Sequence, residues 1–241
     1  MDSTAIALAN AIVGFSAAMS ALTGFGYALV AAPFLVLVFP PHEVVPVVMV
    51  SWIPLAALLL GEARGAMNLR RIGGWLTGAV VGIPVGVYGL AHIAEGPMRV
   101  VIGGITVAAA LAMWVHPARP WRHEAAAAPI AGLLSGLLGG ASGMSGPPVV
   151  LFALNQGWPP AETRANLIGY FVAKHAIALV SLALFGVLDR RAIELSLWAM
   201  PGLGVGAAVG LYLKSRVPPQ RFRQVALVLV LVGGGLAIAR H

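Results

Sequence analysis

The sequence predicts an all-α polytopic membrane protein that forms a single transmembrane domain over residues 1–241. The chain is 59% hydrophobic and only 10% charged, whereas an ordinary soluble domain carries about 25% charged residues. Apolar segments recur from one end to the other, and the loops between them are too short to hold a soluble domain. The formal net charge of +7 lies in these loops, so it indicates membrane topology and argues against nucleic-acid binding.

We expect about eight to ten apolar helical segments, most of them near the length of about 20 residues that crosses a bilayer. They cover residues 4–22, 27–39, 43–61, 72–92, 98–115, 127–141, 147–156, 163–186, 192–213 and 220–239. The first segment has neither a preceding basic region nor a following cleavage site, so we expect it to be retained rather than removed as a signal peptide. Segments 27–39 and 147–156 are too short to cross the bilayer.

Each short segment follows a glycine-rich interruption. Residues 139–148 read GGASGMSGPP, and residues 23–27, TGFGY, are a fainter copy. Glycine permits positive φ, and proline removes a backbone donor, so each interruption predicts a broken helix or a re-entrant hairpin. Because unpaired backbone groups are costly in lipid, such breaks usually lie in a binding site of a transporter. A tight loop at the membrane surface is the alternative.

The chain also shows a weak internal duplication. The first repeat covers about 5–115, the linker 116–126 and the second repeat about 127–239. Residues 12–16 resemble 130–134, and residues 40–43 resemble 159–162. Re-entrant hairpins would make the two repeats inverted, whereas kinked spans would make them parallel. The distribution of Arg and Lys between the loops favours inverted repeats.

The two breaks supply most of the candidate site residues. Helices that restart after each break would point their N–H groups and positive dipole ends at one place, which predicts an anion site near the membrane midplane. Hydroxyl groups at the breaks could add hydrogen-bond donors. The candidates are Thr23, Gly24, Phe25, Gly26 and Tyr27 at the first break, and Ser142, Gly143, Met144, Ser145 and Gly146 at the second.

Polar residues inside the segment 163–186 complete the candidate site. Asn166, Tyr170 and Lys174 are spaced by four and share one helix face, which we expect to point into the protein. Lys174 could balance an anion's charge, and His175 could carry a proton or bond the substrate. Snorkelling of the lysine and simple packing of the histidine are the alternatives. The chain has no Cys, and we expect no cofactor or metal.

Two further groups have structural interpretations. Glu43 and Glu162 each follow a Pro-Pro pair, which is typical of negative charge near a helix N-terminus. Five tryptophans near segment ends are expected to be interfacial anchors: Trp75, Trp114, Trp121, Trp158 and Trp198.

One pattern suggests an enzyme. Residues 143–146 fit the G-x-S-G pattern of rhomboid intramembrane serine proteases, with His175 as the only plausible base. The helix of His175 lacks the glycine spacing of that class, and the second break stays unexplained, so we do not expect an enzyme. A passive anion channel is the other alternative to a transporter.

At its glycine-rich motifs the chain resembles the TauE/SafE family of sulfite exporters. The resemblance rests on Gly24-Phe25-Gly26, on the run 139–148 and on Arg164-Ala165. It implies a multi-pass protein of the cell (inner or plasma) membrane that exports small anions such as sulfite, sulfoacetate or related organosulfonates. Lys174 and His175 match no motif of the family, and Asn166 stands where the family often has Thr. A homodimer, the coupling ion and the direction of transport stay open.

Overall fold

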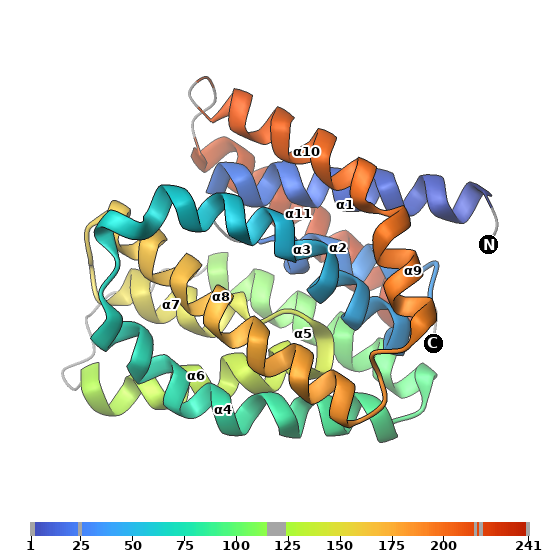
Figure 1. Cartoon of the computed structure of the whole chain (residues 1–241), viewed down its shortest axis with the longest axis horizontal. Coiled ribbons are helices and arrows are strands. Elements are labelled where there is room, and N and C mark those ends of the chain that lie inside the picture. Colours follow the sequence, from blue (N-terminus) through green and yellow to red (C-terminus); the bar gives the residue numbers. More distant parts are fainter. Residues whose placement is uncertain (1–2, 24–25, 115–123, 215, 217–218, 240–241) are drawn as a thin grey trace.

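A computed structural model describes residues 3–23, 26–114, 124–214, 216 and 219–239, and these form an all-helical fold without strands (Figure 1). The helices are α1 (Ser3–Thr23), α2 (Tyr27–Leu35), α3 (Pro41–Ala63), η1 (Arg64–Ala66), α4 (Leu69–His92), α5 (Glu95–Trp114), α6 (Glu124–Ser142), α7 (Gly146–Asn155), α8 (Pro160–Leu184), α9 (Arg190–Trp198), α10 (Met200–Leu213) and α11 (Pro219–Ala239). The all-α prediction is confirmed. The expected linker 116–126 lies mostly outside the described residues, and α6 begins within it, at Glu124.

Six helices in the described part of the chain are long and apolar enough to cross a membrane: α1, α3, α4, α5, α6 and α8. A seventh span is formed if α9 and α10, which are bent by 45° at their junction, count as one. The apolar segment expected over 192–213 is thus divided between two helices. Pro201, in the first turn of α10, has no N–H for a hydrogen bond to the preceding turn, which favours a bend at this junction.

Asn10 of α1 compensates for the break between α9 and α10. Its side-chain amide donates to the Trp198 carbonyl at 2.8 Å and accepts from the Gly202 N–H at 2.7 Å. These two backbone groups belong to the end of one helix and the start of the next, where no intrahelical partner exists. A protein side chain therefore satisfies groups that lipid could not.

Glycine rows bring two helix pairs into backbone contact. On α4, Gly78 and Gly82 face the backbone of α6, so a methyl group on either would collide with the carbonyl of Pro129 or Leu133. On α10, Gly202 and Gly206 face α1 in the same manner, against Asn10 and Gly14. Close approach of this kind is how membrane helices associate without a hydrophobic driving force.

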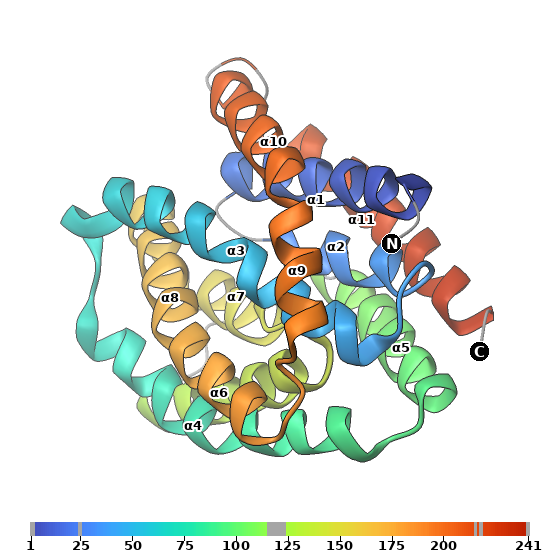
Figure 2. The ribbon, with the colours of Figure 1, turned by 45° about the vertical axis from the view of Figure 1, so that its right-hand side comes forward.

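The main helix pairs each join a helix from the first half of the sequence to a helix from the second half. Helix α1 of the first half packs on α10 of the second, and α6 of the second half packs on α4 of the first; α3 lies beside α8, and α5 beside α11. Figures 1 and 2 show that α1 and α6 run in opposite directions, as do α3 and α8. One face of the molecule, called here the linker face, carries the end of α5 and the start of α6 (left in Figure 1). The repeat relationship itself stays a prediction.

Candidate functional site

The starts of the two short helices meet at one small cavity of about 40 Å³. Helix α2 has 9 residues and α7 has 10, so each covers only part of a bilayer. Four further helices contribute side chains to the wall. The lining residues are Ser20 of α1, Gly26 to Leu29, Val48 and Trp52 of α3, Met113 of α5, Gly143 to Pro147, and Phe171 and His175 of α8.

Helix α2 begins directly at the cavity. Gly26, which precedes it, has φ 94°, a left-handed conformation that favours glycine. No side chain caps this helix start, and the first α-helical bond there runs from the Val30 N–H to the Gly26 carbonyl at 3.1 Å. The N–H groups of Tyr27, Ala28 and Leu29 therefore have no partner inside the helix.

Helix α7 begins on the other side of the same cavity. The break before it turns at Gly143, with φ 79°, and Ser145 precedes the first helical residue without a side-chain cap. Pro147 and Pro148 have no N–H, so the donors left at this start belong to Ser145 and Gly146. The second helix start thus offers fewer donors than the first.

Ser20 is a wall residue that the sequence analysis missed. It is 0% exposed, and in the described part of the chain its hydroxyl has no hydrogen-bond partner. A buried hydroxyl without a partner is costly, which is why such a group in a cavity wall indicates a ligand or water site. No motif marks Ser20, because it lies in a run of small residues before the first break.

Two predicted hydroxyl donors are already used within the protein. The Ser51 hydroxyl donates to the Val47 carbonyl at 2.5 Å, so the Tyr27 hydroxyl, 2.6 Å away, must donate its own proton to Ser51. The Ser142 hydroxyl donates to the Leu138 carbonyl at 2.7 Å and accepts from the Met144 N–H at 3.3 Å. Tyr27 lines the cavity without a free proton, and Ser142 shapes the break instead of lining the cavity.

Helix α8 presents two faces to two neighbours. Phe171 and His175, four residues apart, line the cavity. The His175 ring stacks on Trp52 with 4.3 Å between ring centroids, and its Nδ1 lies 2.7 Å from the Phe171 carbonyl. Sequence reasoning identified His175 but could not predict its stacking partner.

The other face of α8 carries Asn166, Tyr170 and Lys174, all buried as expected but absent from the cavity wall. The Tyr170 hydroxyl donates to Ser135, whose own hydroxyl donates to the Ser145 carbonyl. Lys174 lies near the end of α6, next to the second break: a methyl group placed on Gly139 would be 3.6 Å from its Nζ. Asn166 accepts a 2.6 Å hydrogen bond from the Asn68 N–H, before the start of α4.

The first break is described only in part. Gly24, Phe25 and the side chain of Thr23 lie outside the described residues. Arg164 of α8 donates to the carbonyls of Ala21 and Leu22 at 3.4 Å. A cation at these last carbonyls of α1 stabilises the helix end that precedes the break.

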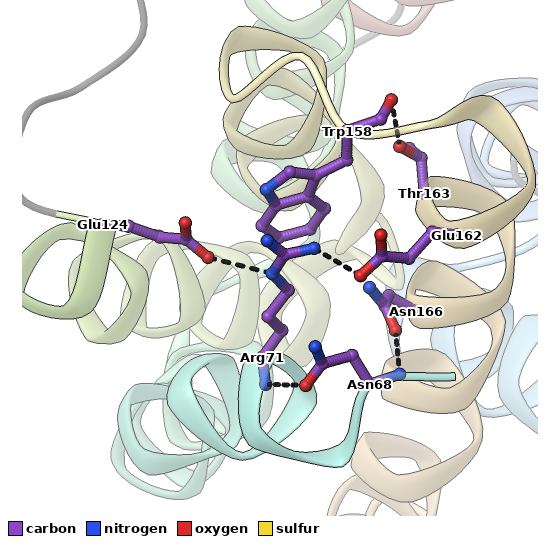
Figure 3. A network of polar contacts seen from close by, with 7 residues as sticks. All are labelled: Asn68, Arg71, Glu124, Trp158, Glu162, Thr163 and Asn166. Atoms are coloured by element: carbon purple, nitrogen blue, oxygen red, sulfur yellow. Dashed lines mark hydrogen bonds and ion pairs between the residues drawn. The ribbon is translucent and has the colours of Figure 1, made fainter. Parts of the chain in front are cut away.

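An ion-pair cluster joins α4, α6 and α8 at the linker face (Figure 3). Arg71 donates to Glu124 at 3.1 Å and also to Glu162, and its guanidinium lies 4.1 Å from the ring centroid of Trp158. Glu162 therefore pairs with an arginine of another helix, a contact that the capping interpretation did not include.

The structure changes the interpretation of two further residues, Glu43 and Trp75. Glu43 is buried and pairs with Arg191 at 3.0 Å, so it links α3 to α9 instead of serving only its own helix start. Trp75 is 0% exposed and packs against Phe152 and Tyr170, so its prediction as an interfacial anchor is wrong. Proximity to a segment end does not show which way a side chain points, and this one points inward.

Comparison with known proteins defines the class of the chain as a multi-pass membrane transporter of the cell membrane. The model of the family described as "Sulfite exporter TauE/SafE" matches residues 8–236, and the chain belongs to this family. It is 30% identical over 197 residues to the "Probable inner membrane transporter protein TsaS" of Comamonas testosteroni, covering 80% of this chain and 74% of that protein. It is 23% identical over 237 residues to the "Probable sulfite/organosulfonate exporter TauE" of Cupriavidus necator, covering 95% and 92%. No solved structure matches the chain.

Proposed function

We propose that the protein is a secondary transporter that exports small anions of the sulfite or organosulfonate type. The observation that carries this proposal is the meeting of two uncapped helix starts, those of α2 and α7, at one cavity. Each helix start bears about half a positive charge together with N–H donors, which favours an anion. The anion is bound between the two breaks, near the membrane midplane.

The rest of the wall supports an anionic ligand. Among the described residues that line the cavity none is Asp or Glu, so no fixed negative charge opposes binding. The hydroxyls of Ser20 and Ser145 add polar groups, and Trp52 and Phe171 supply apolar surface. A volume of about 40 Å³ exceeds the space that one water needs and suits a small polyatomic anion.

The relatives support sulfur oxyanions as the substrate class. The Cupriavidus protein that covers nearly the whole chain is described as a sulfite/organosulfonate exporter. Sulfite and the sulfonate group share three acceptor oxygens around one sulfur, and backbone N–H groups from two helix starts can bond such a group from two sides.

Inverted repeats would give this site access to either side of the membrane. The opposite directions of α1 and α6 and of α3 and α8 support inversion (Figure 1). Among the described residues, the helix ends at the linker face carry Arg70, Arg71, Arg164, Lys214 and Arg216, and those at the opposite face carry Arg99, Arg190 and Arg191, which supports a cytoplasmic linker face. Rocking of one repeat against the other then exposes the cavity to each side in turn.

Neither alternative function has a comparable observation. A serine protease needs a base hydrogen-bonded to its nucleophile, but the described residues show no such bond between Ser145 and His175, whose Nδ1 faces the Phe171 carbonyl. A passive channel would conduct without saturation, which flux measurements distinguish from transport.

The test combines ligand binding with flux. Purified full-length protein is heated with sulfite, sulfate, thiosulfate, sulfoacetate and acetate, and the unfolding temperature is recorded. A bound anion at 100 times its Kd stabilises the folded state by about 2.7 kcal/mol, so sulfite or sulfoacetate should raise the unfolding temperature. Proteoliposomes should then show saturable uptake of the same anion.

Two serines on α1 provide a matched control. Ser20→Ala removes the unpartnered hydroxyl from the cavity wall and should weaken the stabilisation by sulfite. Ser16→Ala, one turn earlier, removes a hydroxyl that donates to the Ile12 carbonyl at 2.7 Å and should leave the stabilisation unchanged. No stabilisation of the wild type by any sulfur oxyanion would overturn the proposed function.

A further inference from the structure

His175 is held in the cavity wall by contacts that fix which ring nitrogen carries a proton. Its Nδ1 lies 2.7 Å from the Phe171 carbonyl, which can only accept a hydrogen bond, so Nδ1 must carry the hydrogen. The ring is further held by stacking on Trp52 at 4.3 Å between centroids. In the neutral ring, Nε2 is then a lone-pair acceptor, and no hydrogen bond to it is found among the described residues.

This acceptor differs from the other polar groups around the cavity. The starts of α2 and α7 present N–H donors, and Ser20 and Ser145 present hydroxyl groups. An anion's oxygens suit all of these donors, whereas the lone pair on Nε2 of the neutral ring repels an anion that contacts His175. The mismatch disappears when Nε2 takes up a proton, because the ring then becomes a cation with a second N–H donor.

Among the described residues that line the cavity, no carboxylate lies beside this histidine to neutralise its charge. On α8 the adjacent residue is Lys174, which is 1% exposed and adds positive charge. Tyr27 of α2 is the other titratable residue in the described cavity wall, and its proton goes to Ser51. Helix α7 has no titratable side chain. The described titratable side chains of α3, α4 and α6 belong to residues near helix ends: His42, Glu43, Arg70, Arg71, His92 and Glu124.

We propose that His175 is the proton-binding residue of the transport cycle, so that each anion binds together with a proton on Nε2. This inference rests on the proposed function and adds its coupling ion. The proton comes from water on the side to which the cavity opens, an N–H bond forms at Nε2, and the imidazolium pairs with the anion. When the anion leaves, the same proton returns to water. Pairing lowers by one the net charge carried through the bilayer core, where charge is costly.

The experiment measures proton uptake on binding with a probe that does not titrate. Methanesulfonate stays fully ionised between pH 5.5 and 8.5, so any proton taken up is bound by the protein. Isothermal titration of the purified full-length protein in two buffers of different ionisation enthalpy gives the number of protons bound. Sulfite is measured in parallel.

The wild type should take up a fraction of one proton per methanesulfonate, and its affinity should fall as pH rises, by up to tenfold per pH unit. His175→Gln keeps a polar side chain without a titrating proton and should bind with no uptake and a flat pH profile. His175→Phe keeps the stack on Trp52 and serves as a second variant if His175→Gln fails to fold. His92→Gln, on the exposed last turn of α4, should behave as the wild type.

Three results would overturn the inference. Binding of methanesulfonate without proton uptake in the wild type would remove the proton from the cycle while leaving the proposed function intact. Uptake that persists in the His175 variants and is lost in Lys174→Met would place the proton on Lys174. Failure of the wild type to bind either methanesulfonate or sulfite would overturn the proposed function and this inference with it.

Discussion

Tyr170 donates a hydrogen bond to Ser135 at 2.8 Å, and through Ser135 it holds the backbone at the second break. The Ser135 hydroxyl donates in turn to the Ser145 carbonyl at 2.5 Å, directly before α7. Tyr170 is 0% exposed and stands at the centre of an aromatic cluster with Trp75 and Phe171. One side chain of α8 thus joins the core of the protein to the start of the helix that faces the cavity.

Tyr170→Phe removes this hydroxyl and keeps the ring. We expect a loss of about 0.5–1.5 kcal/mol in stability, the typical net contribution of one hydrogen bond. The unfolding temperature in detergent should fall by about 2–4 °C per kcal/mol. Tyr212→Phe on α10, where the side chain is 59% exposed, is the control and should cause no shift. Equal shifts for both variants would show that the Tyr170 hydroxyl does not stabilise the break.

Gly143 is the glycine of the second break that we expect to be irreplaceable. Its φ of 79° costs an L-residue about 1–2 kcal/mol, and a methyl group there would lie 3.4 Å from Val48 Cγ1. Gly143→Ala should therefore lower both the unfolding temperature and the affinity for the transported anion. At Gly146 the nearest atom to a methyl group would be Phe171 Cζ at 3.9 Å, so Gly146→Ala should be tolerated.

A suitable control lies in the last helix. Gly235 has ordinary helical φ and open space around it, whereas a methyl group on its neighbour Gly234 would lie 3.0 Å from the Gly103 carbonyl oxygen. Gly235→Ala should therefore leave stability and binding unchanged. If Gly143→Ala behaved like Gly235→Ala, the left-handed turn would not be required for the site.

The sequence indicates where helices end and restart near 23–27 and 139–148, because the chemistry at these positions is local, while broken spans or re-entrant hairpins there stay a prediction. Gly26 and Gly143 both have positive φ, and α7 begins at Gly146 with prolines in its first turn. The meeting of the breaks at one cavity follows from long-range packing, which local chemistry does not specify. It was expected only by analogy with other transporters.

Side-chain direction is the part that the sequence could not settle. Spacing by four placed Asn166, Tyr170 and Lys174 on one face, which the contacts with α4 and α6 bear out. The same spacing puts Phe171 and His175 on an adjacent face, and only the packing of α3 against α8 decides which face meets the cavity. The sequence therefore does not specify how α8 is rotated about its own axis.

The glycine contact between α4 and α6 should be essential for folding. A methyl group on Gly132 would collide with the carbonyl of Trp75, so the two helices would have to separate. Gly132→Ala should destabilise the protein by about 1–3 kcal/mol or more, as overpacking does. Gly73→Ala, on α4 with nothing near the added methyl, is the control. A monodisperse Gly132→Ala protein with the wild-type unfolding temperature would contradict this packing.

Membrane topology can be tested because the chain has no Cys. The linker face is expected to be cytoplasmic, so single Cys residues replacing Gly65 or Lys214 should not react with a membrane-impermeant reagent in intact cells. Cys residues replacing Ala94 or Arg190, on the opposite face, should react. All four positions are exposed, so access within the protein is comparable. Labelling at Lys214 without labelling at Gly65 would support parallel repeats.

Lys174 should affect anion affinity and stability in opposite directions. Its side chain is 1% exposed, and its Nζ lies beside Gly139 at the second break without lining the cavity. At such a place a positive charge attracts an anion through the protein, by about 1–2 kcal/mol for unit charges 10 Å apart at an effective dielectric constant of about 20. Burial of the same charge is costly for the fold.

Lys174→Met keeps the bulk of the side chain and removes its charge. We expect the Kd of the anion to rise about tenfold without loss of binding, because the helix starts of α2 and α7 keep their dipoles and N–H groups. The unfolding temperature without anion should rise, since a buried charge is gone. Lys174→Arg keeps the charge in a larger planar group and should bind with intermediate affinity. Titration of both variants with the anion that stabilises the wild type checks this, and an unchanged Kd in Lys174→Met would limit Lys174 to helix packing.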